Sequence, residues 1–141
     1  MGSKKRVLIL CTGNSARSQM AEGLLRNIAG DKFEVESAGV NPSSVRPEAV
    51  EAMREVDIDI SHHKSKSVEQ FVSERFDFVI TVCDNAHETC PIFPNAARRI
   101  HQRFEDPPAP GAATPDETLS IFRRVRDEIR DYLVEFAKKN S

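Results

Sequence analysis

The sequence predicts an α/β fold in which helices cover both faces of a parallel sheet. Apolar runs of strand length alternate along the chain with amphipathic helical patterns, an order typical of parallel sheets. The first predicted strand, residues 6–10, is almost continuously apolar, as in a strand buried on both faces. Chemically useful side chains directly follow three predicted strands: Cys11, Cys83 and Asp106. Because ligands of such sheets bind beyond the carboxyl ends of the strands, we expect a site at this edge.

The first half of the chain contains two predicted strands and two predicted helices. After the strand at residues 6–10 and a short loop, residues 18–29 carry an apolar side chain every four positions and end before a glycine, which predicts a helix. Residues 33–38 alternate between apolar and polar side chains, which predicts a second strand. Residues 47–56 begin with a proline and predict a short helix.

The second half repeats the alternation and ends in the clearest helical pattern of the chain. A short helix is predicted at residues 68–73, and strands are predicted at residues 76–82 and 98–104. Residues 107–115, rich in proline, alanine and glycine, predict a loop. From residue 119 to residue 136 apolar side chains recur every three or four positions, with charged residues between them, as in an amphipathic helix.

Size and charge exclude several classes of protein. The 141 residues are enough for one domain, and we place residues 1–141 in a single domain. The net charge of -2 gives no sign of a nucleic-acid-binding surface. No run approaches the ~20 apolar residues of a membrane span, and residues 7–10 are too few for the core of a signal peptide. We therefore expect a cytoplasmic monomer with neither a membrane nor a nucleic-acid partner.

The sequence holds three cysteines, Cys11, Cys83 and Cys90. In a reducing compartment a structural disulfide framework is not expected, so these thiols are core residues, metal ligands or catalysts. A zinc site would use Cys83, His87 and Cys90, with Cys11 as a fourth ligand. Unrelated cysteines buried in the core are the other alternative to catalysis.

Residues 11–17, Cys-Thr-Gly-Asn-Ser-Ala-Arg, join the first predicted strand to the first predicted helix. Inward-pointing N–H groups of such a loop form an anion-binding nest, to which the following helix adds the positive end of its dipole. Glycine and asparagine suit its unusual backbone angles. Arg17 offers a planar guanidinium group to an oxyanion. The positive electrostatic field of the loop and the helix start also favours the thiolate form of Cys11. The alternative interpretation of Cys11 is a small buried core residue at a strand end. We predict an oxyanion site made by Thr12, Gly13, Asn14, Ser15, Ala16, Arg17 and Ser18.

The segment from Cys11 to Glu22 resembles the signature of the low-molecular-weight tyrosine phosphatases, and more closely that of the thioredoxin-coupled arsenate reductases built on that fold. The resemblance implies a four-stranded parallel sheet flanked by helices, and no cofactor. Ala16 departs from it harmlessly, because many members carry an additional, non-essential cysteine there. The resemblance covers nearly the whole chain, including residues 36–39, 57–61 and 122–129, Cys83 with Cys90, and Asp106-Pro107.

The additional cysteines favour a reductase over a phosphatase. Phosphoryl transfer needs one thiol, whereas reduction of arsenate to arsenite needs two electrons and hence a second thiol that closes a disulfide. By the resemblance, Cys11 attacks arsenate, Cys83 attacks the Cys11 sulfur and expels arsenite, and Cys90 attacks Cys83; thioredoxin then reduces the Cys83–Cys90 disulfide. Asp106 protonates the departing oxygen in this scheme, and its alternative role is that of a loop-capping aspartate.

In a subset of the family, a potassium ion lies behind the anion loop on residues that correspond to Asn14, Glu22 and Ser37, and on an aspartate. Lys66 stands at the aspartate position, so we expect no metal here. We predict that its ammonium pairs with Glu22 and braces the loop; the alternative is a solvated lysine on a polar turn. The neighbouring histidines, His62 and His63, are interpreted as surface residues.

The alternative function is a low-molecular-weight protein tyrosine phosphatase. Such enzymes often carry a tyrosine after Asp-Pro, where this chain has Pro108, and the single tyrosine, Tyr132, lies in the last predicted helix. Weak phosphatase activity on small esters is compatible with the reductase. A non-catalytic anion or metal sensor is a third hypothesis, against which the intact Cys11, Arg17 and Asp106 argue.

Overall fold

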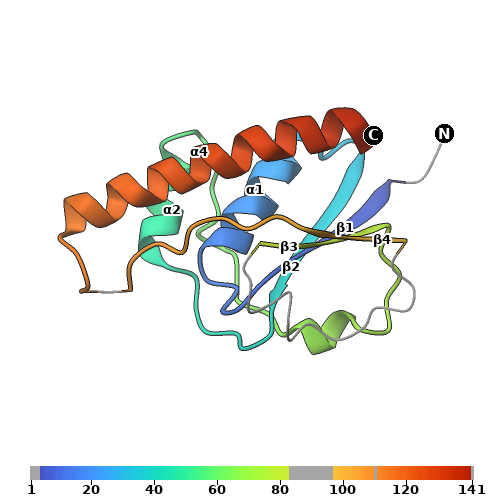
Figure 1. Ribbon diagram of the computed structural model, residues 1–141, viewed down its shortest axis with the longest axis horizontal. Coiled ribbons are helices and arrows are strands. Elements are labelled where there is room, and N and C mark those ends of the chain that lie inside the picture. Colours follow the sequence, from blue (N-terminus) through green and yellow to red (C-terminus); the bar gives the residue numbers. More distant parts are fainter. Residues whose placement is uncertain (1–3, 83–96, 110, 141) are drawn as a thin grey trace.

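A computed structural model describes residues 4–82, 97–109 and 111–140, and at its centre lies a four-stranded parallel sheet (Figure 1). The strands follow the order β2-β1-β3-β4 across the sheet. β1 pairs with β2 on one side and with β3 on the other. Cys11 of β1 lies opposite Gly39 of β2, and Leu10 of β1 lies opposite Thr81 of β3. Because all the pairings are parallel, the carboxyl ends of the four strands lie at the same edge of the sheet. The strands are β1 (Lys5–Cys11), β2 (Phe33–Gly39), β3 (Phe78–Thr81) and β4 (Arg98–His101).

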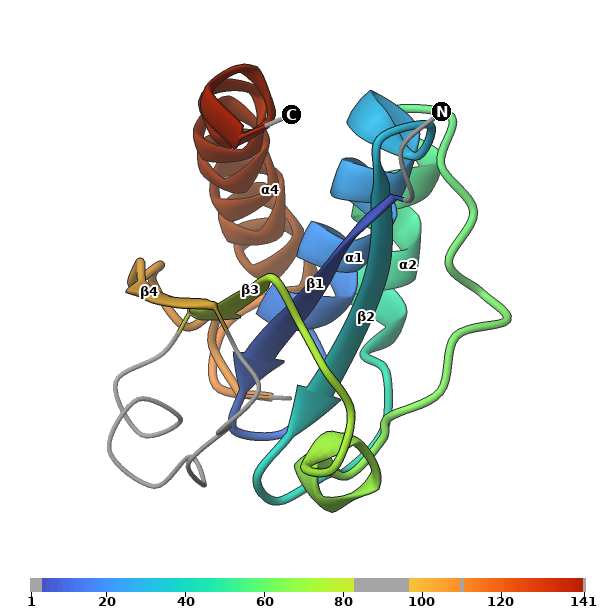
Figure 2. The same cartoon turned by 90° about the vertical axis from the view of Figure 1, so that its right-hand side faces the viewer.

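Helices lie on both sides of this sheet, as the sequence predicts. Three α-helices pack together on one face: α1 (Arg17–Ala29), α2 (Pro47–Arg54) and the long α4 (Pro115–Asn140). The short 3-10 helix η1 (Val68–Phe71) lies on the opposite side of the sheet (Figures 1 and 2). The predicted α/β class with a four-stranded parallel sheet is confirmed.

Burial of apolar side chains explains why these segments take these positions. The five residues of β1 from Val7 to Cys11 are buried, which is the pattern expected of a strand covered on both faces. Phe136 of α4 packs against the rings of Phe33 and Phe78 at 5.5 and 5.1 Å, so the last helix is joined directly to the sheet. Each such ring contributes roughly 1.5–3 kcal/mol by leaving water. The buried stripe of α4 consists of Phe122, Val125, Ile129, Leu133 and Phe136.

Two predicted strands are shorter in the structure than the sequence suggests. The third covers Phe78–Thr81 rather than residues 76–82, and the fourth covers Arg98–His101 rather than residues 98–104. The extra apolar residues are buried for other reasons. Phe76 packs against Phe71 of η1, and Phe104 lies beyond β4, where its N–H donates to the carbonyl oxygen of Val82. Phe76 and Phe104 are thus buried outside the hydrogen-bonded residues of β3 and β4, and their apolar character makes the predicted strands too long.

Within the described residues, no helix combines the length and the apolarity needed to cross a lipid bilayer.

Candidate functional site

Cys11 is the last residue of β1, and its thiol is buried at the start of the loop that leads to α1. Its Sγ lies 2.9 Å from Ser18 Oγ, in the first turn of α1. Ala16, at the N-cap of this helix, supplies no side-chain oxygen to the first amides, and no acidic residue stands in the first turn. The positive end of the helix is therefore neither capped nor neutralised by its own side chains, which suits an anion.

The carbonyl oxygens of residues 11–15 are held by chain segments behind the loop. Those of residues 11, 12, 13 and 15 accept hydrogen bonds from backbone N–H groups of residues 40–46, which follow β2, at 2.8–3.3 Å. The carbonyl of Asn14 accepts one from Ser65 Oγ at 2.7 Å. The loops after β1 and β2 accordingly lie side by side (Figure 2).

This arrangement orients the amides of the loop. Across a planar trans peptide, the C=O of one residue and the N–H of the next point in opposite directions. Carbonyl groups held from behind therefore leave the N–H groups of residues 12–16 directed toward the front, the orientation that an anion-binding nest requires. Asn14 takes the left-handed conformation that the sequence suggests, with φ of 48°. Gly13 does not, so the expectation of an unusual backbone at this glycine is wrong.

Gly39 is a residue of this site that sequence reasoning did not select. It lies opposite Cys11 in the sheet, directly beneath the loop. A Cβ at this position would stand 2.7 Å from the carbonyl oxygen of Thr12 and 2.8 Å from the amide nitrogen of Asn14. Both are backbone atoms of the nest, so any side chain at Gly39 would displace the loop itself.

Arg17 and Asp106 meet at the mouth of the loop. Arg17 Nη1 donates to the carbonyl oxygen of Phe104 at 3.1 Å, and Arg17 Nη2 lies 3.4 Å from Asp106 Oδ1. The arginine side chain is only 11% exposed, whereas that of Asp106 is 73% exposed. The structure thus brings the predicted oxyanion ligand and the predicted proton donor together, with the carboxyl group open to solvent.

A network of polar side chains supports the loop from behind. Asn14 Nδ2 donates to Ser18 Oγ and to Ser37 Oγ, at 2.8 and 3.0 Å, and Ser37 Oγ donates to Glu22 Oε1 at 2.5 Å. Asn14 Oδ1 accepts from the backbone N–H of Lys66 and from Gln19 Nε2, both at 2.9 Å. Every polar atom of the Asn14 amide is therefore in use, which fixes the left-handed residue of the nest.

Positive charge surrounds Glu22, whose side chain is only 3% exposed. Arg26 Nη1 lies 3.0 Å from Glu22 Oε2, and Lys66 Nζ lies 3.6 Å from Glu22 Oε1. Lys66 Nζ is closer to Glu36 Oε1, at 3.0 Å, so its ammonium bridges two carboxylates. Lys66 is thus not the solvated lysine of the alternative interpretation.

His63 is also part of this cluster, and its interpretation as a surface residue is wrong. Its side chain is buried, with Nδ1 2.9 Å from Gln19 Oε1 and Nε2 3.9 Å from Glu22 Oε2. Burial lowers the pKa of His63 below its ordinary value, and the nearby carboxylate of Glu22 opposes this shift only in part. The ring is therefore neutral at pH 7. His62 is exposed, as expected.

Cys83 and Cys90 lie outside the described residues, as does His87 of the zinc alternative. The approach to Cys83 is described. Val82, which precedes Cys83, donates its N–H to the carbonyl oxygen of Leu10, which precedes Cys11, at 2.9 Å. Val82, the last described residue before Cys83, therefore lies beside the end of β1 that carries Cys11.

Known proteins resemble this chain along almost its whole length. The model of the low molecular weight phosphotyrosine protein phosphatase family matches residues 6–140. An arsenate reductase of Oceanobacillus iheyensis is 45% identical over 136 residues, which make up 96% of this chain and 97% of that protein. A solved arsenate reductase in a phosphate-binding state is 33% identical, with a TM-score of 0.82 and coverage of 97% and 99% of the two chains. A thioredoxin-dependent arsenate reductase of Corynebacterium glutamicum is 27% identical, with a TM-score of 0.76, covering 98% of this chain and 62% of that one.

Proposed function

The chain belongs to the low molecular weight phosphotyrosine protein phosphatase family, and within it we propose an arsenate reductase that works through Cys11, Cys83 and Cys90. The observation that carries the proposal is the loop of residues 11–17, which combines a buried thiol, carbonyl groups held from behind and the guanidinium of Arg17 at the carboxyl end of β1. Arsenate is a tetrahedral oxyanion, and this loop binds such a group by charge and geometry. The names of the similar proteins agree with this substrate.

The first chemical step belongs to Cys11. Its thiolate attacks the arsenic of bound arsenate, an As–S bond forms, and one arsenate oxygen leaves as water. Asp106 supplies a proton to that oxygen, for which an exposed carboxyl group at the mouth of the loop is suitably placed. The amides of the loop and Arg17 hold the remaining oxygens through charge-assisted hydrogen bonds.

Reduction then passes from sulfur to sulfur. The Cys83 thiolate attacks Cys11 Sγ, an S–S bond forms, and the As–S electron pair stays on arsenic, which departs as arsenite. Cys90 next attacks Cys83, which frees Cys11 and leaves a Cys83–Cys90 disulfide. A dithiol partner restores both thiols. The thioredoxin dependence named for the Corynebacterium glutamicum protein supports thioredoxin in that role.

The alternative function, a tyrosine phosphatase, is not favoured by the residue that follows Asp106-Pro107. Pro108 occupies the position at which such enzymes often carry a tyrosine, and its carbonyl oxygen accepts a hydrogen bond from Arg46. Tyr132 packs between Phe104 and Phe136, and burial raises its pKa above the ordinary value. Weak hydrolysis of small phosphate esters stays compatible with the reductase.

One assay separates the two functions. The protein is mixed with arsenate, thioredoxin, thioredoxin reductase and NADPH, and hydrolysis of p-nitrophenyl phosphate is followed in parallel. We expect NADPH oxidation that depends on arsenate and forms one arsenite for each NADPH consumed, together with slow ester hydrolysis. Rapid ester hydrolysis without arsenate-dependent NADPH oxidation would identify a phosphatase instead.

We also propose that Lys66 takes the place of a potassium ion behind the loop. A potassium ion on Asn14, Glu22 and Ser37 would be bound by oxygen atoms of these side chains. Here the cationic groups of Lys66 and Arg26 already lie beside the Glu22 carboxylate. These residues therefore do not suit an added cation. The Michaelis constant for arsenate and the melting temperature should then be equal in potassium chloride and in sodium chloride at equal ionic strength.

Replacement of the lysine tests its bracing role. Lys66→Ala should lower the free energy of unfolding by more than the ~0.5 kcal/mol typical of surface changes, because two carboxylates lose a common partner. Lys64→Ala, an exposed lysine two positions away, is the matched control and should stay within that limit. Urea unfolding measures both. Activation by potassium but not by sodium would contradict the proposal.

A further inference from the structure

The loop that carries Asp106 is held mainly through its carbonyl oxygens. Pro107 and Pro108 have no N–H group, so this segment has fewer backbone donors with which to anchor itself. On one side of Asp106, the carbonyl of Phe104 accepts from Arg17 at 3.1 Å. On the other side, the carbonyl of Pro108 accepts from Arg46 Nη1 at 2.7 Å. Two arginines thus bracket the proposed proton donor.

Arg46 is itself fixed from several directions. Its backbone N–H donates to the carbonyl oxygen of Ser15, in the anion loop, at 2.9 Å. Its Nη2 donates to Glu48 Oε2 at 3.1 Å, and its guanidinium lies 5.0 Å from the ring centroid of Phe122. The side chain is only 13% exposed. Arg46 is therefore a short, ordered link between the loop that holds the nucleophile and the loop that holds the acid.

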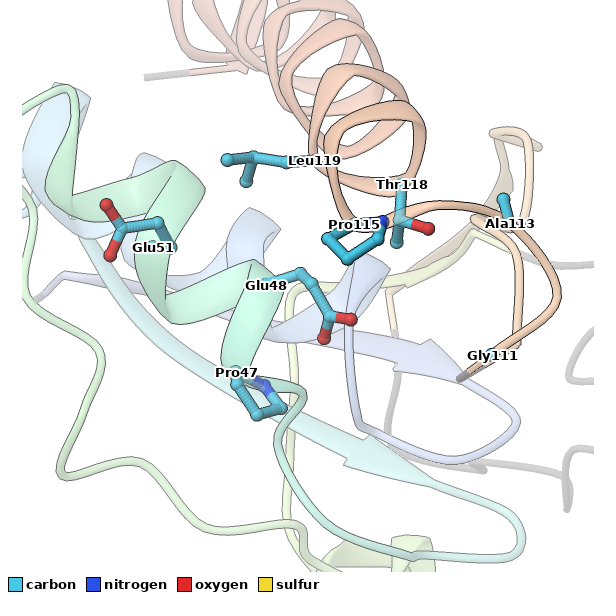
Figure 3. A pocket seen from close by; sticks show the side chains of 8 residues that line it. All are labelled: Pro47, Glu48, Glu51, Gly111, Ala113, Pro115, Thr118 and Leu119. Carbon is cyan, nitrogen blue, oxygen red and sulfur yellow. The ribbon is translucent and has the colours of Figure 1, made fainter.

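Packing around the far end of the acid loop is open, which makes this link more important. A pocket of about 490 Å³ lies between the first turns of α2 and α4 and the residues that lead into α4 (Figure 3). Pro47, Glu48, Pro115 and Leu119 are among its walls. Residues 109, 111 and 112 are exposed, so apolar burial does little to hold them, and the directed hydrogen bond to the Pro108 carbonyl contributes more to the position of this loop.

Other contacts to this loop are weaker candidates. Arg124 pairs with Glu105, next to Asp106, but both side chains are about half exposed, and pairs in solvent contribute little. Arg46 Nε is buried without a hydrogen-bond partner in the part of the chain that the structure describes. A buried donor without a partner costs free energy, which an apolar side chain at this position would avoid. The guanidinium therefore stabilises the structure through the hydrogen bonds of its two Nη atoms.

We propose that Arg46 is a positioning residue for the reaction, which holds Asp106 at the mouth of the anion loop through the carbonyl of Pro108. This inference rests on the proposed function, in which Asp106 is the proton donor. A general acid works only within hydrogen-bond reach of the departing oxygen. A misplacement of about 1 Å can cost roughly 10²-fold in rate. Loss of Arg46 should therefore slow the chemical step and leave the anion loop able to bind its ligand.

A double-mutant cycle tests whether Arg46 acts through Asp106. The proteins are wild type, Arg46→Met, Asp106→Asn and the double variant, and the measured quantity is kcat/KM for arsenate with saturating thioredoxin. Arg46→Met should lower it by about 10-fold in the wild-type background, as expected for part of a general acid's contribution. In the Asp106→Asn background the same substitution should change it by less than about 2-fold. The inhibition constant of inorganic phosphate should stay within about 2-fold throughout.

Two further variants keep the test sharp. Arg54→Met removes an arginine from the last residue of α2, the helix that Arg46 precedes; Arg54 pairs with Glu51 in solvent, and its loss should leave kcat/KM unchanged. Arg46→Lys keeps the charge and the stem over Phe122 but cannot reach Pro108 and Glu48 together; we expect it to behave like Arg46→Met. If Arg46→Met fails to fold, Arg46→Lys takes its place in the cycle. Urea unfolding checks each protein.

The possible failures differ from one another. An equal loss of kcat/KM in both backgrounds would overturn the role of Arg46 and leave the proposed function intact. An Asp106→Asn protein with full kcat/KM would overturn the assignment of the acid and the positioning role together.

Discussion

Cys11→Ser is expected to abolish arsenate reduction, with a loss of at least about 10³-fold in kcat/KM. The Cys11 sulfur lies at the start of the loop, between the backbone amides, the uncapped start of α1 and Arg17. A serine hydroxyl in the same place does not ionise near neutral pH, and it cannot form the disulfide through which two thiols supply two electrons to arsenic. Ester hydrolysis should disappear with it, because both activities begin with the same nucleophile.

The substitution should leave the rest of the molecule intact. Cys11 is buried and contacts Ser18 Oγ, and a serine hydroxyl fits in the same space and can form a hydrogen bond with Ser18. We therefore expect unchanged binding of inorganic phosphate, measured by calorimetry, and a similar urea midpoint. Ser44→Ala, in the exposed segment that follows β2, serves as the matched control and should keep full activity. Arsenite formation by the Cys11→Ser protein would show that another group is the nucleophile.

Cys83→Ser is expected to stop turnover with thioredoxin completely while sparing slow ester hydrolysis. Without this thiol the As–S adduct on Cys11 has no partner with which to form the disulfide, so two electrons cannot reach arsenic. In the proposed mechanism, phosphate-ester hydrolysis needs only Cys11, Arg17 and Asp106, and Arg17 contacts Asp106 and the Phe104 carbonyl directly. The expected pattern, one activity lost and the other kept, separates a redox role from a structural one.

Cys90→Ser is the natural companion variant. It should still form up to one arsenite per chain, because Cys11 and Cys83 remain, but it should not cycle efficiently with thioredoxin. Arsenite is measured directly after a quench, and thioredoxin oxidation is followed through NADPH. Sustained arsenate reduction by the Cys83→Ser protein would disprove the order of the relay.

Much of the fold is predictable because its signals are local. The strand at residues 6–10 is marked by a continuous apolar run, and the stripe that runs to residue 136 repeats with the period of a helix; both elements appear in the structure. The loop of residues 11–17 is equally local, since a nucleophile, a nest and a helix start follow one another directly in the chain. Strand ends were less predictable, because burial of Phe76 and Phe104 continues beyond the ladders.

The supporting residues could not be found from local patterns. Gly39 matters because the loop passes directly over it, and this close approach depends on the register of β1 and β2. Arg46 reaches Pro108 across a sequence separation of 62 residues, and it binds a backbone carbonyl, which every residue type offers. His63 is buried only because Gln19 and Glu22 face it from α1. Tertiary contacts of this kind leave no periodic trace in the sequence.

The central claim is that this chain reduces arsenate with its own thiols, and a single-turnover experiment tests it most directly. Fully reduced protein is mixed with excess arsenate in the absence of thioredoxin or any other reductant, then quenched for measurement of arsenite and of titratable thiols. We predict one arsenite per chain and the loss of two of its three thiols. Three thiols that persist after exposure to arsenate, with no arsenite formed, would contradict the account.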